Sequence, residues 1–225
     1  MFYSRPMRVF LIHGMARSPA SMALLAARLR KAGHQTHLFG YFVTRETLED
    51  IAGRLTRRVE KALASAGGPA AEPYAIVGHS LGNVIARLAS PRLPAGLSRL
   101  IMIAPPNRPA VAARWLVDNA VFRVLTQDAG QKLADPEFYD RLPHPSVPTL
   151  VIAGTAGLKA PWLPFEGRPN DCVVALEETR LEGAATLEVE GIHTFLMNRR
   201  DVFEAVHGFL ETGHLNAADA VAQTG

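Results

Sequence analysis

The stretch Ala75-Ile76-Val77-Gly78-His79-Ser80-Leu81-Gly82-Asn83 decides the fold expected for this chain. Three apolar residues that suit a buried strand lead into Gly-x-Ser-x-Gly, and a helical pattern of apolar residues follows at once. We expect a sharp turn at Ser80 that holds its hydroxyl above the end of the strand. Glycine is expected at Gly78 and Gly82 for a steric reason, because a Cβ at either position would strike the neighbouring strand or helix.

Apolar strand-like runs alternate with amphipathic helical patterns along the rest of the sequence. Strands are expected at 9–12, 36–42, 74–77, 97–104, 149–153 and 186–189. Helices are expected at 18–33, 48–63, 81–89, 111–125 and 201–211. The alternation predicts an α/β fold: a mostly parallel sheet of about six strands with helices on both faces.

The length of 225 residues suits one domain, 1–225. Within it we expect a short helical, lid-like insertion at about 108–148, made of one helix at 111–125 followed by a proline-rich loop. The residues 214–225 look like a flexible tail.

Composition argues against several classes of partner. The formal net charge is only +3 and the arginines are spread along the chain, so no nucleic-acid surface is indicated. No run approaches the roughly 20 apolar residues of a membrane span, and the first residues lack the apolar core of a signal peptide. The single cysteine, Cys172, fits a reducing compartment. We therefore expect a cytoplasmic protein without stable membrane insertion.

Four residues with chemically useful side chains follow predicted strands: His13, Ser80, Asp171 and His193. Carboxyl ends of parallel strands share one edge of the sheet, so these side chains can meet there. A serine hydroxyl needs a base to take its proton as it attacks, and His193 is the candidate. Asp171 would orient the imidazole. The nearby acids Glu166 and Glu177 are the alternatives to Asp171.

Several of these motifs resemble the α/β-hydrolase fold family, and the match extends from about residue 7 to 212. The similarity is greatest to compact bacterial lipases and esterases that lack a large cap domain. It rests on Gly78-His79-Ser80-Leu81-Gly82, Ile12-His13-Gly14, Asn170-Asp171-Cys172-Val173-Val174 and Gly191-Ile192-His193. Their chain order, Ser then Asp then His, is that of the family.

The resemblance implies a serine hydrolase of carboxylic esters with the triad Ser80, Asp171 and His193. It also implies an oxyanion hole made by the backbone N–H groups of Met15 and Leu81. Two positions depart from the family pattern, since many members have glycine where this chain has Asn83 and Cys172. These changes leave the catalytic groups in place, but a thiol beside the acid could make the site oxidisable.

The substrate is expected to be a small ester with a modest hydrophobic acyl group. Candidate substrate-binding residues are His13, Trp115, Trp162 and Phe165, although His13 suits a structural role in the oxyanion loop and the apolar residues can equally cover the core. No metal-ligand spacing and no phosphate loop is present, so no metal or cofactor is expected. Three alternatives stay open. A thioesterase, lactonase, amidase or acyltransferase would use the same triad, and an enzyme of other chemistry, such as carbon–carbon bond hydrolysis, would use the same fold. A binding protein without catalytic activity would keep the fold alone.

Overall fold

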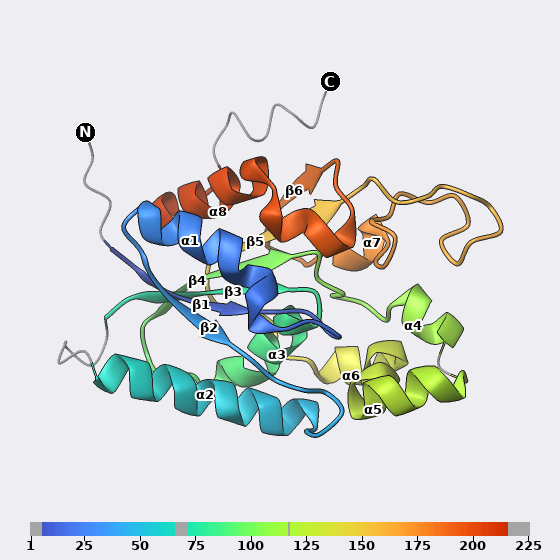
Figure 1. The fold of residues 1–225 in the computed structure, drawn as a ribbon, viewed down its shortest axis with the longest axis horizontal. Helices are drawn as coiled ribbons and strands as arrows, with labels where there is room; N and C mark the ends of the chain where they lie inside the picture. The colour runs from blue at the N-terminus through green and yellow to red at the C-terminus, as the bar shows by residue number, and fades with distance from the viewer. Residues whose placement is uncertain (1–5, 66–71, 117, 216–225) are drawn as a thin grey trace.

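A six-stranded sheet forms the centre of the molecule. The computed structural model describes residues 6–65, 72–116 and 118–215. The strands are β1 (Arg8–Ile12), β2 (Gln35–Phe39), β3 (Tyr74–His79), β4 (Leu97–Ile103), β5 (Thr149–Gly154) and β6 (Ala185–Val189). They lie in the order β2-β1-β3-β4-β5-β6, and every neighbouring pair is parallel (Figure 1). The predicted parallel sheet is confirmed.

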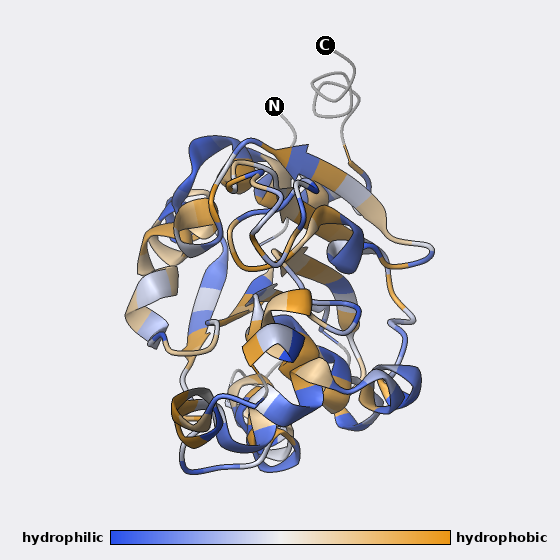
Figure 2. Cartoon of the chain, turned by 90° about the vertical axis from the view of Figure 1, so that its right-hand side faces the viewer, coloured by the Kyte–Doolittle hydropathy of each residue, from blue (hydrophilic) through white to orange (hydrophobic). Residues whose placement is uncertain are grey.

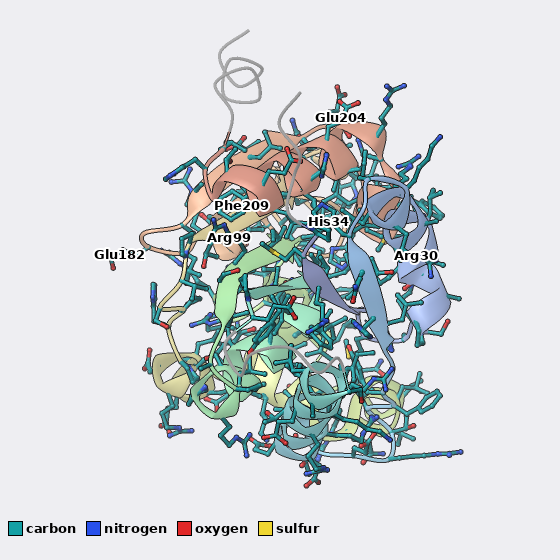
Figure 3. The ribbon with its side chains drawn as sticks, turned by 90° about the vertical axis from the view of Figure 1, so that its left-hand side faces the viewer. Arg30, His34, Arg99, Glu182, Glu204 and Phe209 are labelled. Carbon is teal, nitrogen blue, oxygen red and sulfur yellow. The ribbon has the colours of Figure 1, made fainter. Side chains whose placement is uncertain are left out.

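Helices cover both faces of this sheet. The two on one face are α1 (Ala23–Lys31) and α8 (Arg200–Thr212), and the two on the other are α2 (Leu48–Ala64) and α3 (Leu81–Ala89) (Figures 1 and 3). Side chains of a strand alternate between its faces. Val9 and Leu11 of β1 accordingly pack in the cluster with α1 and α8, whereas Phe10 and Ile12 pack in the cluster with α2 and α3. The sheet thus has a buried apolar layer on each side.

Local signals in the sequence place several helix ends. Thr47 begins α2, since its hydroxyl oxygen accepts a hydrogen bond from the Asp50 N–H at 3.2 Å. Gly213 ends α8 with a left-handed backbone, φ 77°. The first predicted helix starts as a 3-10 turn, η1 (Pro19–Met22), before α1 begins.

The segment between β4 and β5 differs from the expected single helix and loop. It forms α4 (Val111–Leu116), α5 (Ala120–Ala134) and α6 (Pro136–Arg141). The single helix is wrong because Asn119 Oδ1 accepts from the Val121 N–H at 3.0 Å and so begins a second helix. The loop is wrong because Asp135 accepts from the Glu137 N–H at 2.9 Å and caps α6, with Pro136 at its first position.

Three more short elements were not expected from the sequence. They are the helix α7 (Leu176–Thr179) and the 3-10 turns η2 (Ser90–Arg92) and η3 (His193–Asn198). Figure 2 shows the side of the molecule where the strands end, with polar and apolar stretches interleaved along the helices and loops there. This edge of the sheet is where the candidate site lies.

A flexible tail is predicted at 214–225, and from residue 216 on it lies outside the described residues. Among the helices of the described ranges, none combines the length and the hydrophobicity that crossing a bilayer requires.

Candidate active site

Ser80 occupies the sharp turn between β3 and α3. Its backbone has φ 52° and ψ −123°, a conformation that residues other than glycine rarely adopt. The Ser80 N–H donates to the Ile103 carbonyl at 2.9 Å, and the Asn83 N–H donates to the Ser80 carbonyl at 3.0 Å. Strained backbone of this kind persists only where the surrounding structure imposes it, and it gathers at functional sites. The turn therefore marks Ser80 as a candidate functional residue.

The glycines on either side of the turn are required by close packing. A Cβ on Gly78 would lie 2.9 Å from the Asn83 backbone nitrogen, and a Cβ on Gly82 would lie 2.6 Å from the Ile12 carbonyl oxygen. Contacts that short would force the backbone apart. The steric reason predicted for both glycines is confirmed.

The loop after β1 passes directly beside Ser80. A Cβ built on Gly14 would stand 3.0 Å from the Cβ of Ser80. Met15 and Leu81, the residues expected to supply oxyanion donors, line the same small pocket as Ser80. The structure therefore brings these three residues together.

Asp171 and His193 meet in the loops that follow β5 and β6. His193 Nδ1 lies 2.8 Å from Asp171 Oδ2, and the His193 backbone N–H donates to the Asp171 carbonyl at 2.9 Å. The second carboxylate oxygen, Oδ1, accepts from the N–H groups of Val173 at 3.0 Å and Val174 at 2.7 Å. A carboxylate only accepts, so Nδ1 carries the imidazole proton and Nε2 is free to act as a base.

The alternative acids lie elsewhere. Glu166 is exposed and lies 3.9 Å from the Arg168 guanidinium, and Glu177 pairs with the same arginine. Of the three acids considered, Asp171 is the one in contact with His193. Within the described ranges, no three His, Cys, Asp or Glu side chains are grouped as metal ligands would be.

His79 connects the turn to the loop that carries His193. Its side chain is buried, and Nε2–H donates to the His193 carbonyl oxygen at 3.0 Å. Burial lowers the pKa of His79 well below its usual range, and the neighbouring His193 lowers it further. Nδ1 of His79 is buried without a hydrogen-bond partner in the described residues, so a second proton would leave an unpaired N–H. His79 is therefore a neutral support for the loop.

His13 supports the loop after β1 rather than facing the site with free polar atoms. Its ring stacks on Tyr41 at 4.3 Å, Nδ1–H donates to the Gly14 carbonyl at 2.8 Å, and Nε2 accepts from the Tyr41 N–H at 3.3 Å. The Tyr41 hydroxyl donates to the His13 carbonyl at 2.9 Å. Both nitrogens are thus occupied, and burial lowers the pKa of His13.

The three aromatic candidates lie away from the pocket at Ser80. Trp115 and Trp162 are 71% and 84% exposed, and they line a shallow hollow with Arg114. Phe165 is 5% exposed and lies in the loop after β5. None of the three is among the residues that line the pocket beside Ser80.

Solved structures of known proteins match most of this chain. The lipase BlEst2 of Bacillus licheniformis in its mature form has a TM-score of 0.68 at 19% identity, over 92% of this chain and 93% of that one. An extracellular α/β-hydrolase from a Paenibacillus species has a TM-score of 0.56 at 16% identity, over 92% and 99%. This chain has the α/β-hydrolase fold. An esterase from Exiguobacterium antarcticum has a TM-score of 0.67 at 15% identity, over 93% and 94%. No family model and no curated protein matches the sequence.

The structure shows how Asn83 and Cys172, the two departures from the usual α/β-hydrolase pattern, are accommodated. Asn83 is fully buried, and its Nδ2 donates to the carbonyls of Ser80 at 3.0 Å and Ile103 at 3.1 Å. It therefore reinforces the turn of this α/β-hydrolase fold. Cys172 is exposed and has φ 82°, a conformation that glycine adopts without strain. Its N–H donates to Asn170 Oδ1 at 2.8 Å, which helps to hold the strained residue.

Glu178 is a buried carboxyl that the motifs did not reveal. Oε1 accepts from the Val111 N–H at 2.7 Å and Oε2 accepts from the Ala175 N–H at 2.9 Å. Burial raises its pKa. Glu178 thus links the start of α4 to Ala175, which follows the loop that carries Asp171. An acidic residue in a short helix has no sequence signature for this role.

A second buried network holds α6 to the α/β-hydrolase core. Arg87 of α3 donates to the carbonyls of Pro143 at 2.9 Å and Leu142 at 3.1 Å, and to Asn107 Oδ1 at 3.2 Å. Asn107 Nδ2 donates in turn to the Thr179 carbonyl at 2.8 Å. Burial lowers the pKa of Arg87 to about 10. The segment between β4 and β5 is thus fastened to α3.

The free energy of unfolding of this protein is expected to fall as pH drops from about 6.5 toward 5. Burial lowers the pKa values of His13, His34 (Figure 3), His37 and His79 from 6.5. Between pH 6.5 and 5 the unfolded chain binds protons that the folded protein does not bind. The free energy of unfolding therefore has its full value above pH 6.5 and decreases below it. For fully buried His79 alone the slope is up to about 1.4 kcal/mol per pH unit. The partly exposed His37 adds less.

Urea titrations at several pH values measure this slope. The matched variant is His79→Gln, whose amide can still donate to the His193 carbonyl but cannot take up a proton. Its slope should be shallower than that of the wild type, whatever its absolute stability. Identical slopes would show that His79 titrates equally in both states.

Proposed function

We propose that this protein is a serine hydrolase that cleaves small carboxylic esters through an acyl-serine intermediate. The observation that carries the proposal is the 2.8 Å contact between His193 Nδ1 and Asp171 Oδ2, at the same sheet edge as the strained Ser80 turn. Solved structures of the same fold that are named lipase and esterase support it. The roles of Ser80, Asp171 and His193 are those expected from the sequence.

The acylation step uses the tautomer that Asp171 selects. His193 Nε2 takes the proton from the Ser80 hydroxyl as Oγ attacks the ester carbonyl. Asp171, held by the Val173 and Val174 N–H groups, stabilises the imidazolium that forms. The imidazolium then gives its proton to the departing alcohol, and the acyl group remains on Ser80.

Charge on the tetrahedral oxygen needs donors that are already in place. In this proposal the backbone N–H groups of Met15 and Leu81, two residues that line the pocket with Ser80, supply them. Deacylation repeats the sequence with water as the nucleophile: His193 takes the proton of water, the acid departs and Ser80 regains its proton.

The test is intact-protein mass after treatment with a fluorophosphonate. An activated serine displaces fluoride from phosphorus and gains one phosphonyl group. We expect one adduct on the wild type and none on Ser80→Ala, with hydrolysis of 4-nitrophenyl acetate lost in the same variant. Ser146→Ala, which changes an exposed serine in the loop before β5, is the matched control and should keep both.

Folded wild-type protein that takes no adduct and hydrolyses no ester would overturn the proposal in favour of a binding protein on a hydrolase fold. An adduct without ester hydrolysis would direct attention to thioesters, lactones and acyl transfer, which use the same acyl-serine.

A further inference from the structure

A small apolar pocket opens beside Ser80. Its volume is about 130 Å³. Ser80, Leu81 and Met15 contribute to its lining, together with Ala110, Ala113 and Leu133 from the segment between β4 and β5. Among the described residues that line it, Ser80 is the one with a polar side chain. The pocket therefore suits a hydrocarbon group attached to an atom that sits at Ser80.

The walls of this pocket are joined by hydrogen bonds. The Ala110 N–H donates to the Leu133 carbonyl at 2.9 Å, which links the chain before α4 to the end of α5. Buried Glu178 accepts from the Val111 N–H and holds the start of α4. Walls fixed in this way impose a size limit, because enlarging the pocket requires breaking buried hydrogen bonds.

Another part of the wall is held by Asp171. Val173 and Val174 line the pocket, and their N–H groups both donate to Asp171 Oδ1. Expanding the pocket on this side would disturb the carboxylate that holds His193. The size of the bound group is thus coupled to the geometry of the catalytic residues.

We propose that this pocket binds the acyl chain of the substrate and limits it to about four to six carbons; the inference rests on the proposed function. A methylene occupies roughly the 30 Å³ of a water molecule, so a pocket of about 130 Å³ holds about four beyond the carbonyl carbon. Each methylene that enters should raise kcat/KM about fourfold. Longer chains must bend out toward solvent.

The experiment measures kcat/KM for 4-nitrophenyl esters from acetyl to dodecanoyl on the full-length protein. The wild type should reach its maximum at butanoyl to hexanoyl and fall by about tenfold or more at decanoyl. Ala113→Leu adds three carbons to the wall and should lower the hexanoyl-to-acetyl ratio by at least about tenfold. Leu133→Ala removes three carbons and should move the maximum to chains longer by about two carbons.

Ala120→Leu provides the matched control, since Ala120 is exposed at the start of α5 and lies outside the lining. Its chain-length profile should equal that of the wild type. Fluorophosphonate labelling of each variant separates the two proposals. If Ala113→Leu and Leu133→Ala are both labelled but have the chain-length profile of the wild type, the acyl pocket alone is overturned. Wild-type activity that rises through dodecanoyl also overturns it. If Ala113→Leu fails to fold, the shift in Leu133→Ala decides.

Discussion

Replacing His193 with alanine is expected to lower kcat for a soluble ester about 10⁶-fold. In the proposed mechanism His193 takes the Ser80 proton as Oγ attacks, and the serine hydroxyl is a weak nucleophile without that transfer. The neighbouring His79 is a poor substitute, because burial lowers its pKa well below its usual range and so makes it a weak proton acceptor, and because its Nε2–H is donated to the His193 carbonyl. The residual rate should come from the backbone donors and substrate binding.

Steady-state hydrolysis of 4-nitrophenyl butanoate measures the loss, and added imidazole gives a second readout. Imidazole can enter the space left by the side chain, so it should raise the rate of His193→Ala but leave Ser80→Ala inactive. His144→Ala, which removes an exposed histidine before β5, is the control and should retain wild-type kcat. A His193→Ala variant that keeps more than about one hundredth of kcat would place the base elsewhere.

Replacing Asp171 with asparagine should lower kcat about 10⁴-fold while the protein stays folded. Oδ1 accepts from two backbone N–H groups, so the amide oxygen of the new residue must stay on that side. The amide NH₂ then faces His193 Nδ1 and donates to it. Nδ1 becomes the acceptor, Nε2 carries the proton, and the imidazole can no longer accept the proton of Ser80.

The pH dependence of kcat/KM and the melting temperature are measured together for this variant. Asp140→Asn, an exposed change of the same kind in α6, should leave both unchanged. Near-normal activity in folded Asp171→Asn would mean that the carboxylate does not select the tautomer. A folded protein with the expected loss assigns the effect to the 2.8 Å contact rather than to stability.

The sheet and the Ser80 turn could be predicted from the sequence because their determinants are local. A strand, a tight turn and a helix follow one another within 75–89, and Gly78 and Gly82 stand where a Cβ would collide. The motif favours Asp171 over Glu166 and Glu177, and the contact of Asp171 with His193 agrees with that prediction. That Asp171 is the acid in contact with His193 depends on how the loops after β5 and β6 pack.

The pocket could not be predicted in the same way. Ala110, Ala113 and Leu133 are ordinary apolar residues whose meeting point depends on where α4 ends and α5 begins. A side-chain hydrogen bond from the Val121 N–H to Asn119 Oδ1 starts the second helix there and competes with continuation of the first. Small residues such as Ala110 and Ala113 carry no pattern that marks them as pocket residues, whereas the large aromatic side chains of Trp115 and Trp162 stand out in the sequence.

The position of His193 also has a consequence for the order in which the chain becomes active. His193 follows β6, which lies at the edge of the sheet and pairs with β5. Ser80 belongs to the central strands and leaves the ribosome long before β6 does. Under the proposed mechanism, a partly synthesised chain has a nucleophile without a base, and it would gain ester hydrolysis only when the last strand docks. Catalysis would then report completed folding.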